Sequence, residues 1–192
     1  MFTQRCFTSI LFSDLSQMNH RLESLDPEPV AHIQTTLRHM AEQVVNDHGG
    51  VVNQFYGDGM LAAFGLSEPQ KNCDKRAINA ALELHQAVKK VEPPTNIYLP
   101  GFEVNLQSGI HSGVVAIQQG DPIQGRYKLT GDALNTAARL AARAEPNQIL
   151  VSDETIGNIL SFFVADTAIQ FQLKGKSKPV KAYPVLDRRN TN

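Results

Sequence analysis

The sequence predicts a single α+β domain in which helices pack on an antiparallel sheet. Its 192 residues, of which 42% are hydrophobic, suffice for one full-sized core and are too few for two. Short apolar runs rich in strand-forming residues alternate with longer stretches whose apolar residues recur every three or four positions. This alternation of strand and helix patterns indicates one mixed domain.

The first strand and the first helix have clear boundary residues. The run 8–12 is short and apolar, and it leads into Asp14. Asp26 is placed to cap a helix with Pro27 at its first position. Gly49-Gly50 supplies the helix stop, because glycine tolerates the left-handed conformation there. We therefore expect a strand followed by a helix with one buried face.

A hairpin, a second helix and further strands follow. The hairpin consists of the strands 51–55 and 61–64 around a tight turn at 56–59. The helix runs from Asp74 to Pro93-Pro94. Two more strands, 102–110 and 114–117, are expected around a turn at 111–113. Up to Ile110 the order is β-α-β-β-α-β, which is the ferredoxin-like arrangement of two helices on one face of an antiparallel sheet.

The rest of the chain predicts a C-terminal extension of the same domain. Its expected elements are a helix near 132–143, a strand at 149–151, a helix from Ser152, and strands near 169–173 and 180–186. We expect the domain to cover residues 1–187 and residues 188–192 to form a polar tail or the start of a linker.

Composition argues against several classes of function. A net charge of -1 provides no global basic field, so neither a nucleic-acid partner nor membrane contact is expected. No apolar run approaches the roughly 20 residues of a membrane helix, and no secretory signal is visible. Cys6 and Cys73 are far apart, which favours two reduced thiols over a disulfide or a zinc site. We expect the chain in the cytoplasm.

Two aspartates are expected to meet at one edge of the sheet. Asp14 ends the first strand, and Asp58 lies in the turn that opens the third. These strands are antiparallel neighbours in a unit of this order, and adjacent carboxylates repel unless a cation lies between them. Mg²⁺ or Mn²⁺ suits such oxygen ligands. Each aspartate alone also fits ordinary hairpin or helix-cap chemistry.

Asn135 and Arg139 form a second candidate pair. They are four residues apart in a helical stretch, so they project from the same face. A fixed cation beside a hydrogen-bonding amide suits the transition state of a phosphoryl transfer. The alternative is an ordinary solvated helix face.

Short motifs run along almost the whole chain. They are FSD (12–14), LDPE (25–28), HGGVV (48–52), YGDGMLAAFG (56–65), GIHSG (109–113), LTGDALNTAARL (129–140), QILVS (148–152) and LKGK (173–176). In this order and spacing they resemble the catalytic domain of class III adenylate and guanylate cyclases. The resemblance implies the nucleotide cyclase fold, a βαββαβ core with a C-terminal extension.

The resemblance also implies roles for particular residues. Two Mg²⁺ or Mn²⁺ ions would be held by Asp14 and Asp58, together with Leu15, and Asn135 and Arg139 would form the transition-state pair. Substrate contacts would come from Lys174 and Lys176 and from the backbone of a helix-entry turn made of Leu15, Ser16, Gln17, Met18 and Asn19.

A homodimer is implied as well, since in the family one subunit supplies the metal aspartates and the other supplies the Asn and Arg. The implied substrate is a nucleoside triphosphate, which would be closed into a 3′,5′-cyclic monophosphate with release of pyrophosphate. Other domains are expected to be fused to the cyclase domain or to regulate it.

The sequence departs from the family pattern at the base-recognition positions. Gln54 stands where adenylate cyclases usually carry Lys, and Lys128 stands where they carry Asp or Thr. Gln54 can donate and accept toward adenine, with Lys128 as a further donor, but the pair also suits guanine or a pyrimidine. We place ATP first. A second departure is Gln17-Met18-Asn19 in place of the usual Gly-Phe-Thr, which bears on the conformation of that turn.

Two other functions compete with the cyclase interpretation. The altered base-recognition residues would suit an inactive domain that senses nucleotides or dimerises, although retention of all four site residues argues against it. A cyclic dinucleotide synthase also binds metal at the end of its first strand. It requires an acidic pair in its central hairpin turn, however, and Gly57-Asp58-Gly59 supplies only one Asp.

Overall fold

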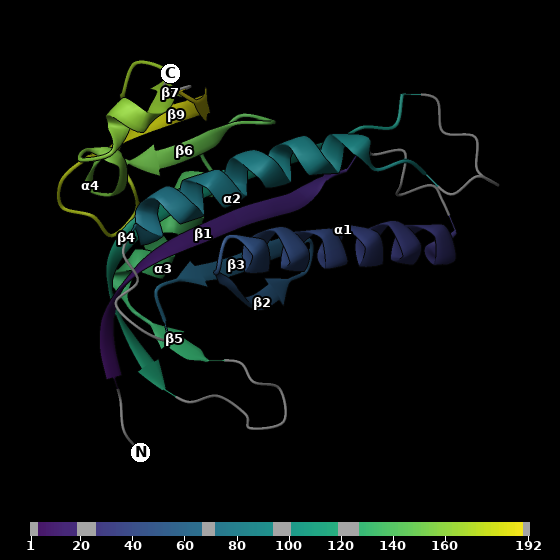
Figure 1. The fold of residues 1–192 in the computed structure, drawn as a ribbon, viewed down its shortest axis with the longest axis horizontal. Helices are drawn as coiled ribbons and strands as arrows, with labels where there is room; N and C mark the ends of the chain where they lie inside the picture. The colour runs from purple at the N-terminus through teal and green to yellow at the C-terminus, as the bar shows by residue number, and fades with distance from the viewer. Residues whose placement is uncertain (1–3, 19–25, 67–71, 94–100, 119–126, 190–192) are drawn as a thin grey trace.

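A computed structural model of the chain describes residues 4–18, 26–66, 72–93, 101–118 and 127–189 (Figure 1). The first elements are β1 (Gln4–Met18), α1 (Pro27–Asp47), β2 (Val51–Tyr56), β3 (Gly59–Phe64), α2 (Cys73–Ala87) and β4 (Val104–Gln118). They are followed by β5 (Lys128–Thr130), α3 (Asp132–Ala141), β6 (Ile149–Ser152), α4 (Asp153–Ile156), β7 (Phe163–Ala165), β8 (Ile169–Phe171) and β9 (Val180–Arg188). The order up to β4 confirms the predicted βαββαβ core, and the later elements form its C-terminal extension.

The described strands form one sheet in the order β2-β3-β1-β4-β6-β9-β7, with β5 paired to β4 and β8 paired to β9. The paired strands are antiparallel except β4 and β6, which are parallel. At the centre lie β1 and β4, each of 15 residues. The predicted antiparallel sheet with helices packed against it is confirmed.

The helices cover both faces of this sheet. Because successive residues of a strand point to opposite faces, Leu11 packs in the core with Ile33 of α1 and Ile78 of α2. Its neighbour Ile10 packs in a second core cluster with Ala137 of α3. Thus α1 and α2 lie on one face and α3 on the other (Figure 1).

The boundaries of α1 follow the predicted signals. Asp26 is the N-cap residue and Pro27 the first helical residue, where the missing N–H of proline costs nothing. At the other end Gly49 adopts a φ of 66°, and the amide of Gly50 donates to the carbonyl of Val45. These are the bonds that close a helix C-terminus.

The prediction of two strands around a turn at 111–113 was wrong. β4 continues through this segment, and His111, Ser112 and Gly113 stand opposite Ile10, Ser9 and Thr8 of β1. Gly113 resembles a turn residue, but its lack of a side chain serves helix packing. A Cβ there would lie 3.2 Å from the Cβ of Ala133 in α3.

Gly109, on the same face of β4, brings α3 closer still. A Cβ at this position would lie 2.2 Å from the carbonyl oxygen of Ala137 and 2.3 Å from the amide nitrogen of Ala141. Both distances are shorter than van der Waals contact, so only glycine lets the backbone of α3 rest on the strand. This contact therefore sets the position of α3, and with it the positions of Asn135 and Arg139.

Strand β1 is longer than the predicted run 8–12, because its pairing with β4 extends from Gln4 to Met18. The short strands β5 and β7 were not predicted. β9 includes Asp187 and Arg188, so the sheet runs one residue into the segment that we expected to be a tail. Among the described residues, no helix combines the length and the apolarity that crossing a membrane requires.

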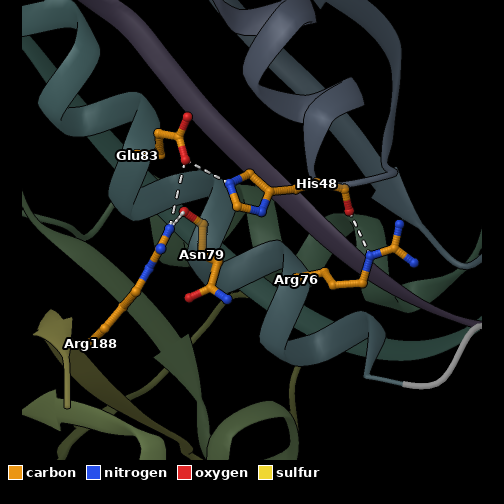
Figure 2. A network of polar contacts seen from close by, with 5 residues as sticks. All are labelled: His48, Arg76, Asn79, Glu83 and Arg188. Carbon is orange, nitrogen blue, oxygen red and sulfur yellow. Dashed lines mark hydrogen bonds and ion pairs between the residues drawn. The ribbon is translucent and has the colours of Figure 1, made fainter. Parts of the chain in front are cut away.

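Polar contacts connect α2 to the end of α1 and to β9 (Figure 2). The guanidinium of Arg76 donates to the carbonyl oxygen of His48 at 2.6 Å. The carboxylate of Glu83 lies 2.9 Å from His48 Nε2 and 3.7 Å from the guanidinium of Arg188, which also donates to the carbonyl of Asn79. These contacts join three separate parts of the chain on the outer side of α2.

Candidate functional site

Asp14 and Asp58 converge as predicted. In the antiparallel pairing of β1 with β3, Asp14 stands opposite Gly59, the residue that follows Asp58. Asp14 is two residues from Phe12 and therefore lies on the same face of β1, the face on which α3 packs. The pairing thus brings the two carboxyl-bearing residues to one edge of the sheet.

Helix α1 holds the turn that carries Asp58. The side-chain amide of Gln34 donates to the Asp58 carboxylate at 2.9 Å, and the guanidinium of Arg38 donates to the carbonyl of Gly57 at 3.1 Å. Gln34 and Arg38 are four residues apart, so they lie one above the other on the helix. Neither residue was predicted to support the site. The i, i+4 spacing of two long polar side chains is the only sequence signal for them.

An aromatic pair lies beside the two aspartates. The rings of Phe12 and Tyr56 stack with their centroids 6.4 Å apart, and Tyr56 is 48% exposed. Tyr56 precedes the Gly57-Asp58 turn, and Phe12 precedes Asp14 by two residues. The edge of the sheet that carries the carboxylates therefore also presents an accessible aromatic surface.

The expectation of a helix-entry turn after Asp14 was wrong for the described part of 15–19. Residues Leu15 to Met18 continue β1, and Asn19 lies outside the described residues. The pairing shifts here, because Asp14 stands opposite Gln107 whereas Gln17 stands opposite Asn105. Two residues of β1 therefore oppose one residue of β4, which is a bulge and leaves backbone groups out of the ladder.

Helix α3 presents Asn135 and Arg139 together, as their spacing predicted. Small apolar residues, among them Ala133 and Ala137, face the sheet. Asn135 is exposed and Arg139 half-buried, so both lie away from that buried side. Asp132, three residues before Asn135, belongs to the same polar side of the helix.

The connection between β8 and β9 packs against this polar side. The ammonium of Lys176 contacts the carboxylate of Asp132, and this hydrogen bond lowers the pKa of Asp132. The guanidinium of Arg139 lies so close to Gly175 that a Cβ there would be 3.5 Å from it. Lys174 is exposed. The structure therefore brings Lys176 and Arg139 together on one side of α3.

A buried histidine lies near the same group. His111 of β4 is hydrogen-bonded through Nδ1 to the hydroxyl of Ser152 at 2.8 Å, and that hydroxyl also contacts Thr155 at 2.9 Å. Burial lowers the pKa of His111; the charge of Glu154 opposes this effect, Lys176 adds to it, and Asp132 opposes it. The ring thus joins β4 to Ser152, the N-cap residue of α4.

The two groups of candidate residues belong to different parts of one chain. Asp14 and Asp58 lie at β1 and β3, whereas Lys176 follows β8, which pairs with β9. In the sheet order β1-β4-β6-β9, three steps of about 4.8 Å separate β1 from β9, roughly 14 Å. The Arg139 guanidinium lies on the β8–β9 side of α3, beside Gly175. The aspartates and the β8–β9 connection that Arg139 approaches are therefore on strands three steps apart in the sheet.

Gln54 and Lys128 border one hydrophobic cluster. Both side chains are exposed. Val51 of β2 and Leu129 of β5, residues close to them in sequence, pack in the cluster that also contains Leu61. Strand β5 itself pairs with β4, so the two exposed residues come from separate strands that contribute to this cluster.

Asp14 and Asp58 suit a divalent cation that is bound together with a nucleotide. Among the described residues, no group of three or more His, Cys, Asp or Glu side chains is placed to hold a metal ion. Mg²⁺ is commonly bound by one or two carboxylates together with substrate phosphates, rather than in an all-protein cage. Two aspartates at adjoining backbone positions of the β1–β3 pairing match that mode of binding.

Comparison with known proteins gives a consistent result. The family model described as the adenylate and guanylate cyclase catalytic domain matches residues 4–186. Among curated proteins, the receptor-type guanylate cyclase gcy-23 of Caenorhabditis elegans is 28% identical over 188 residues, which are 95% of this chain and 17% of that protein. An adenylate cyclase of Dictyostelium discoideum, described as terminal-differentiation specific, is 28% identical over 93% of this chain and 8% of its own length. The chain thus spans less than a fifth of either relative.

Solved structures share the fold. The adenylyl cyclase CyaB of P. aeruginosa superposes with a TM-score of 0.84 at 23% identity, covering 98% of both chains. The guanylyl cyclase Cya2 superposes with a TM-score of 0.85 at 24% identity, covering 98% of this chain and 96% of that one. Cyclases named for either base therefore have this arrangement of strands and helices.

Proposed function

The chain belongs to the adenylate and guanylate cyclase catalytic domain family, and on that premise we propose that it converts a nucleoside triphosphate into a 3′,5′-cyclic nucleotide and pyrophosphate. The observation that carries the proposal is the β1–β3 register, which places Asp14 beside the turn of Asp58. A single chain that also displays Asn135 and Arg139 on one helix contains both types of group that the reaction needs.

The residues proposed to hold two Mg²⁺ or Mn²⁺ ions are Asp14 and Asp58, with the backbone of Leu15. The bulge after Asp14 supports the last assignment, because it frees main-chain groups from the ladder at this point. When bound, such ions would lower the pKa of the ribose 3′-hydroxyl and neutralise charge on the triphosphate. Gln34 keeps Asp58 oriented through its amide without supplying a competing charge.

The remaining groups position the nucleotide and stabilise charge. We assign Arg139 to the charge that develops on the α-phosphate and Asn135 to the ribose, since both project from one side of α3. Lys176, which lies near Arg139, and Lys174 are proposed contacts of the triphosphate. Attack by the 3′-oxygen on the α-phosphorus then expels pyrophosphate in line, a reaction in which the protein mainly positions groups.

We further propose that a two-fold homodimer assembles the site. The aspartates belong to β1 and the β2–β3 turn, whereas Arg139 lies beside Gly175 in the β8–β9 connection, so we expect each group to be completed by the other group of a second copy. A two-fold dimer would then hold two composite sites. The Phe12–Tyr56 stack, in which Tyr56 is 48% exposed, offers apolar surface where the second copy would pack. The greater length of the relatives suits a catalytic module controlled by other domains.

For the base we propose adenine, with guanine as the alternative. The amide of Gln54 can donate to adenine N1 and accept from its amino group, and Lys128, which is also exposed, is a second donor. The same pair can serve guanine, with Lys128 donating to O6 and Gln54 accepting from N1. Because hydrogen bonds to the base discriminate strongly between substrates, these two residues should govern selectivity more than rate.

The test is to incubate the purified chain with Mn²⁺ or Mg²⁺ and with ATP, GTP, CTP or UTP separately, and to identify any cyclic product by mass spectrometry. We expect cyclic AMP, and its absence in the Asp58→Ala variant. No cyclic product from any triphosphate, with nucleotide still bound by a dimer, would refute catalysis and favour a sensing domain.

Mixing two inactive variants tests the composite site. Asp58→Ala retains an intact α3, and Arg139→Ala retains both aspartates, so a mixed dimer contains one complete site. Random pairing of equal amounts should restore about one quarter of the wild-type activity. No recovery in a mixture shown to exchange subunits would refute the shared site.

A further inference from the structure

Two pairs of serines connect the central strands β1 and β4 inside the core. Ser9 stands opposite Ser112, and Ser13 stands opposite Ser108, four residues further along β1. The hydroxyl oxygens are 3.1 Å apart in the first pair and 2.7 Å apart in the second. All four side chains are at most 4% exposed. Buried hydroxyls need hydrogen-bond partners, and Ser13 and Ser108 supply one to each other.

Each pair is completed by a side chain of α2. Ser9 and Ser112 both donate to Oδ1 of Asp74, at 2.5 and 2.6 Å. Ser108 lies 2.8 Å from Nε2 of His85. Asp74 and His85 are eleven residues apart, which is about three helical turns, so both face the sheet. Helix α2 is thus fastened to the two central strands at two separate points.

The directions of the hydrogen bonds at the second point follow from its chemistry. His85 is 4% exposed, and burial lowers its pKa to about 4, so the ring is neutral near pH 7. Its second hydrogen bond is to the backbone of Asn147, where only an imidazole N–H can serve the carbonyl. Nε2 is then the acceptor, Ser108 donates to it, and Ser13 donates to Ser108.

This second connection ends beside the proposed metal site. We infer that Ser13, Ser108 and His85 are positioning residues that fix the end of β1, so that Asp14 meets Asp58 in the geometry required for a divalent cation. The inference rests on the proposed function. The bulge immediately after Asp14 interrupts the pairing with β4, and the Ser13–Ser108 contact links the two strands one residue before the ladder shifts. The Ser9–Ser112–Asp74 connection lies away from the site and only fastens the helix.

The effect of losing this support should be large for metal binding. Removal of the Ser108 hydroxyl leaves Ser13 and His85 without their buried partner, which favours a local shift of the strand. Metal–ligand distances tolerate only about 0.2 Å, and loss of outer-shell contacts typically weakens metal binding by about 10- to 100-fold. A shift that the fold tolerates can therefore still impair the site.

The experiment compares Ser108→Ala with Ser112→Ala. Both serines lie on the same face of the same strand, both are buried, and each substitution removes one hydroxyl. Thermal unfolding measures stability, and Mn²⁺ electron paramagnetic resonance in the presence of a non-cyclisable triphosphate analogue measures the metal dissociation constant. We expect similar decreases in melting temperature. We expect the Mn²⁺ dissociation constant to rise at least about tenfold in Ser108→Ala and less than about twofold in Ser112→Ala.

Substitutions of His85 provide a second measurement that does not depend on Ser108→Ala folding. His85→Gln places an amide near the position of Nε2, whereas His85→Leu offers no partner to Ser108. The Gln variant should retain tighter Mn²⁺ binding than the Leu variant. Equal dissociation constants in the two serine variants, or in the two histidine variants, would overturn the inference.

Asp14→Ala separates failure of the inference from failure of the proposed function. If Asp14→Ala binds Mn²⁺ as tightly as the wild type, the metal site itself is wrong and the inference falls with it. If Asp14→Ala abolishes Mn²⁺ binding while Ser108→Ala leaves it unchanged, the metal site stands and the positioning role alone is refuted.

Discussion

Substitution of Gly109 by alanine should disable the half of the site carried by α3. The added Cβ would lie 2.2 Å from the carbonyl oxygen of Ala137, where ordinary contact begins at 3.4 Å. The neighbouring atoms belong to the backbone of α3, so no side-chain rotation can make room. The helix must therefore move away from β4 by about 1 Å, and Asn135 and Arg139 move with it.

The expected magnitudes follow from this displacement. Overpacking of this kind typically costs about 1–3 kcal/mol of stability. A misplacement of about 1 Å in groups that stabilise a transition state can lower the rate about 100-fold. Gly113→Ala is the matched control, because its Cβ would meet the Cβ of Ala133 at 3.2 Å, which a small adjustment relieves. It should cost less than about 1 kcal/mol and less than about tenfold in kcat.

The assay combines urea unfolding with cyclase kinetics of mixed dimers. Gly109→Ala retains both aspartates, so it should recover activity with Asp58→Ala, which supplies an intact α3, and should not recover with Arg139→Ala. Wild-type kcat in a folded Gly109→Ala variant would refute the argument. Recovery with Arg139→Ala but not with Asp58→Ala would place the damage at the aspartates instead of the helix.

Three further outcomes are expected. Asp132→Asn removes the carboxylate that holds Lys176, so the KM for the triphosphate should fall about threefold with little change in kcat; an increased KM would show that the ion pair helps binding. The pKa of His85 is about 4 in the folded chain and 6.5 in the unfolded chain, so between these pH values only the unfolded chain binds a proton at this residue. The free energy of unfolding should therefore fall by about 3 kcal/mol as the pH decreases through this interval. Urea titrations should show a shallower pH dependence for His85→Gln, and an identical slope would contradict the assignment. Tyr56→Ala should raise the dimer dissociation constant about tenfold, measured by sedimentation equilibrium, because the ring is 48% exposed and stacks on Phe12. Monomer stability should change little, and an unchanged dimer would exclude this surface from the interface.

The first half of the fold could be predicted because its signals are local. Asp26 and Pro27 mark the start of α1, and the Gly57-Asp58-Gly59 turn marks the β2–β3 hairpin, so each element is fixed by neighbouring residues. The pairing of β1 with β3 then follows from the order of elements. The convergence of Asp14 and Asp58 required no side-chain detail, only that order and the antiparallel register.

The errors arose where a residue serves a contact distant in sequence. Gly113 looks like a turn residue, but α3, about 20 positions later in the chain, requires its missing side chain. Gln34 and Arg38 lie on α1 without any apolar pattern to distinguish them, although they hold the turn of Asp58. The bulge after Asp14 likewise depends on the strand opposite, whose register the sequence of β1 does not contain.

The central pairing of β1 with β4 has a consequence for the order in which the chain folds. The partners of β1 in β4 lie roughly 100 residues later, whereas β2 and β3 pair through a short hairpin. During synthesis, α1 and the β1–β3 part of the sheet can form before β4 emerges from the ribosome. Until then, one edge of β1 has no strand to pair with. An uncovered edge invites pairing with other chains. The delay before β4 arrives is therefore an interval in which this edge of β1 can pair with other chains.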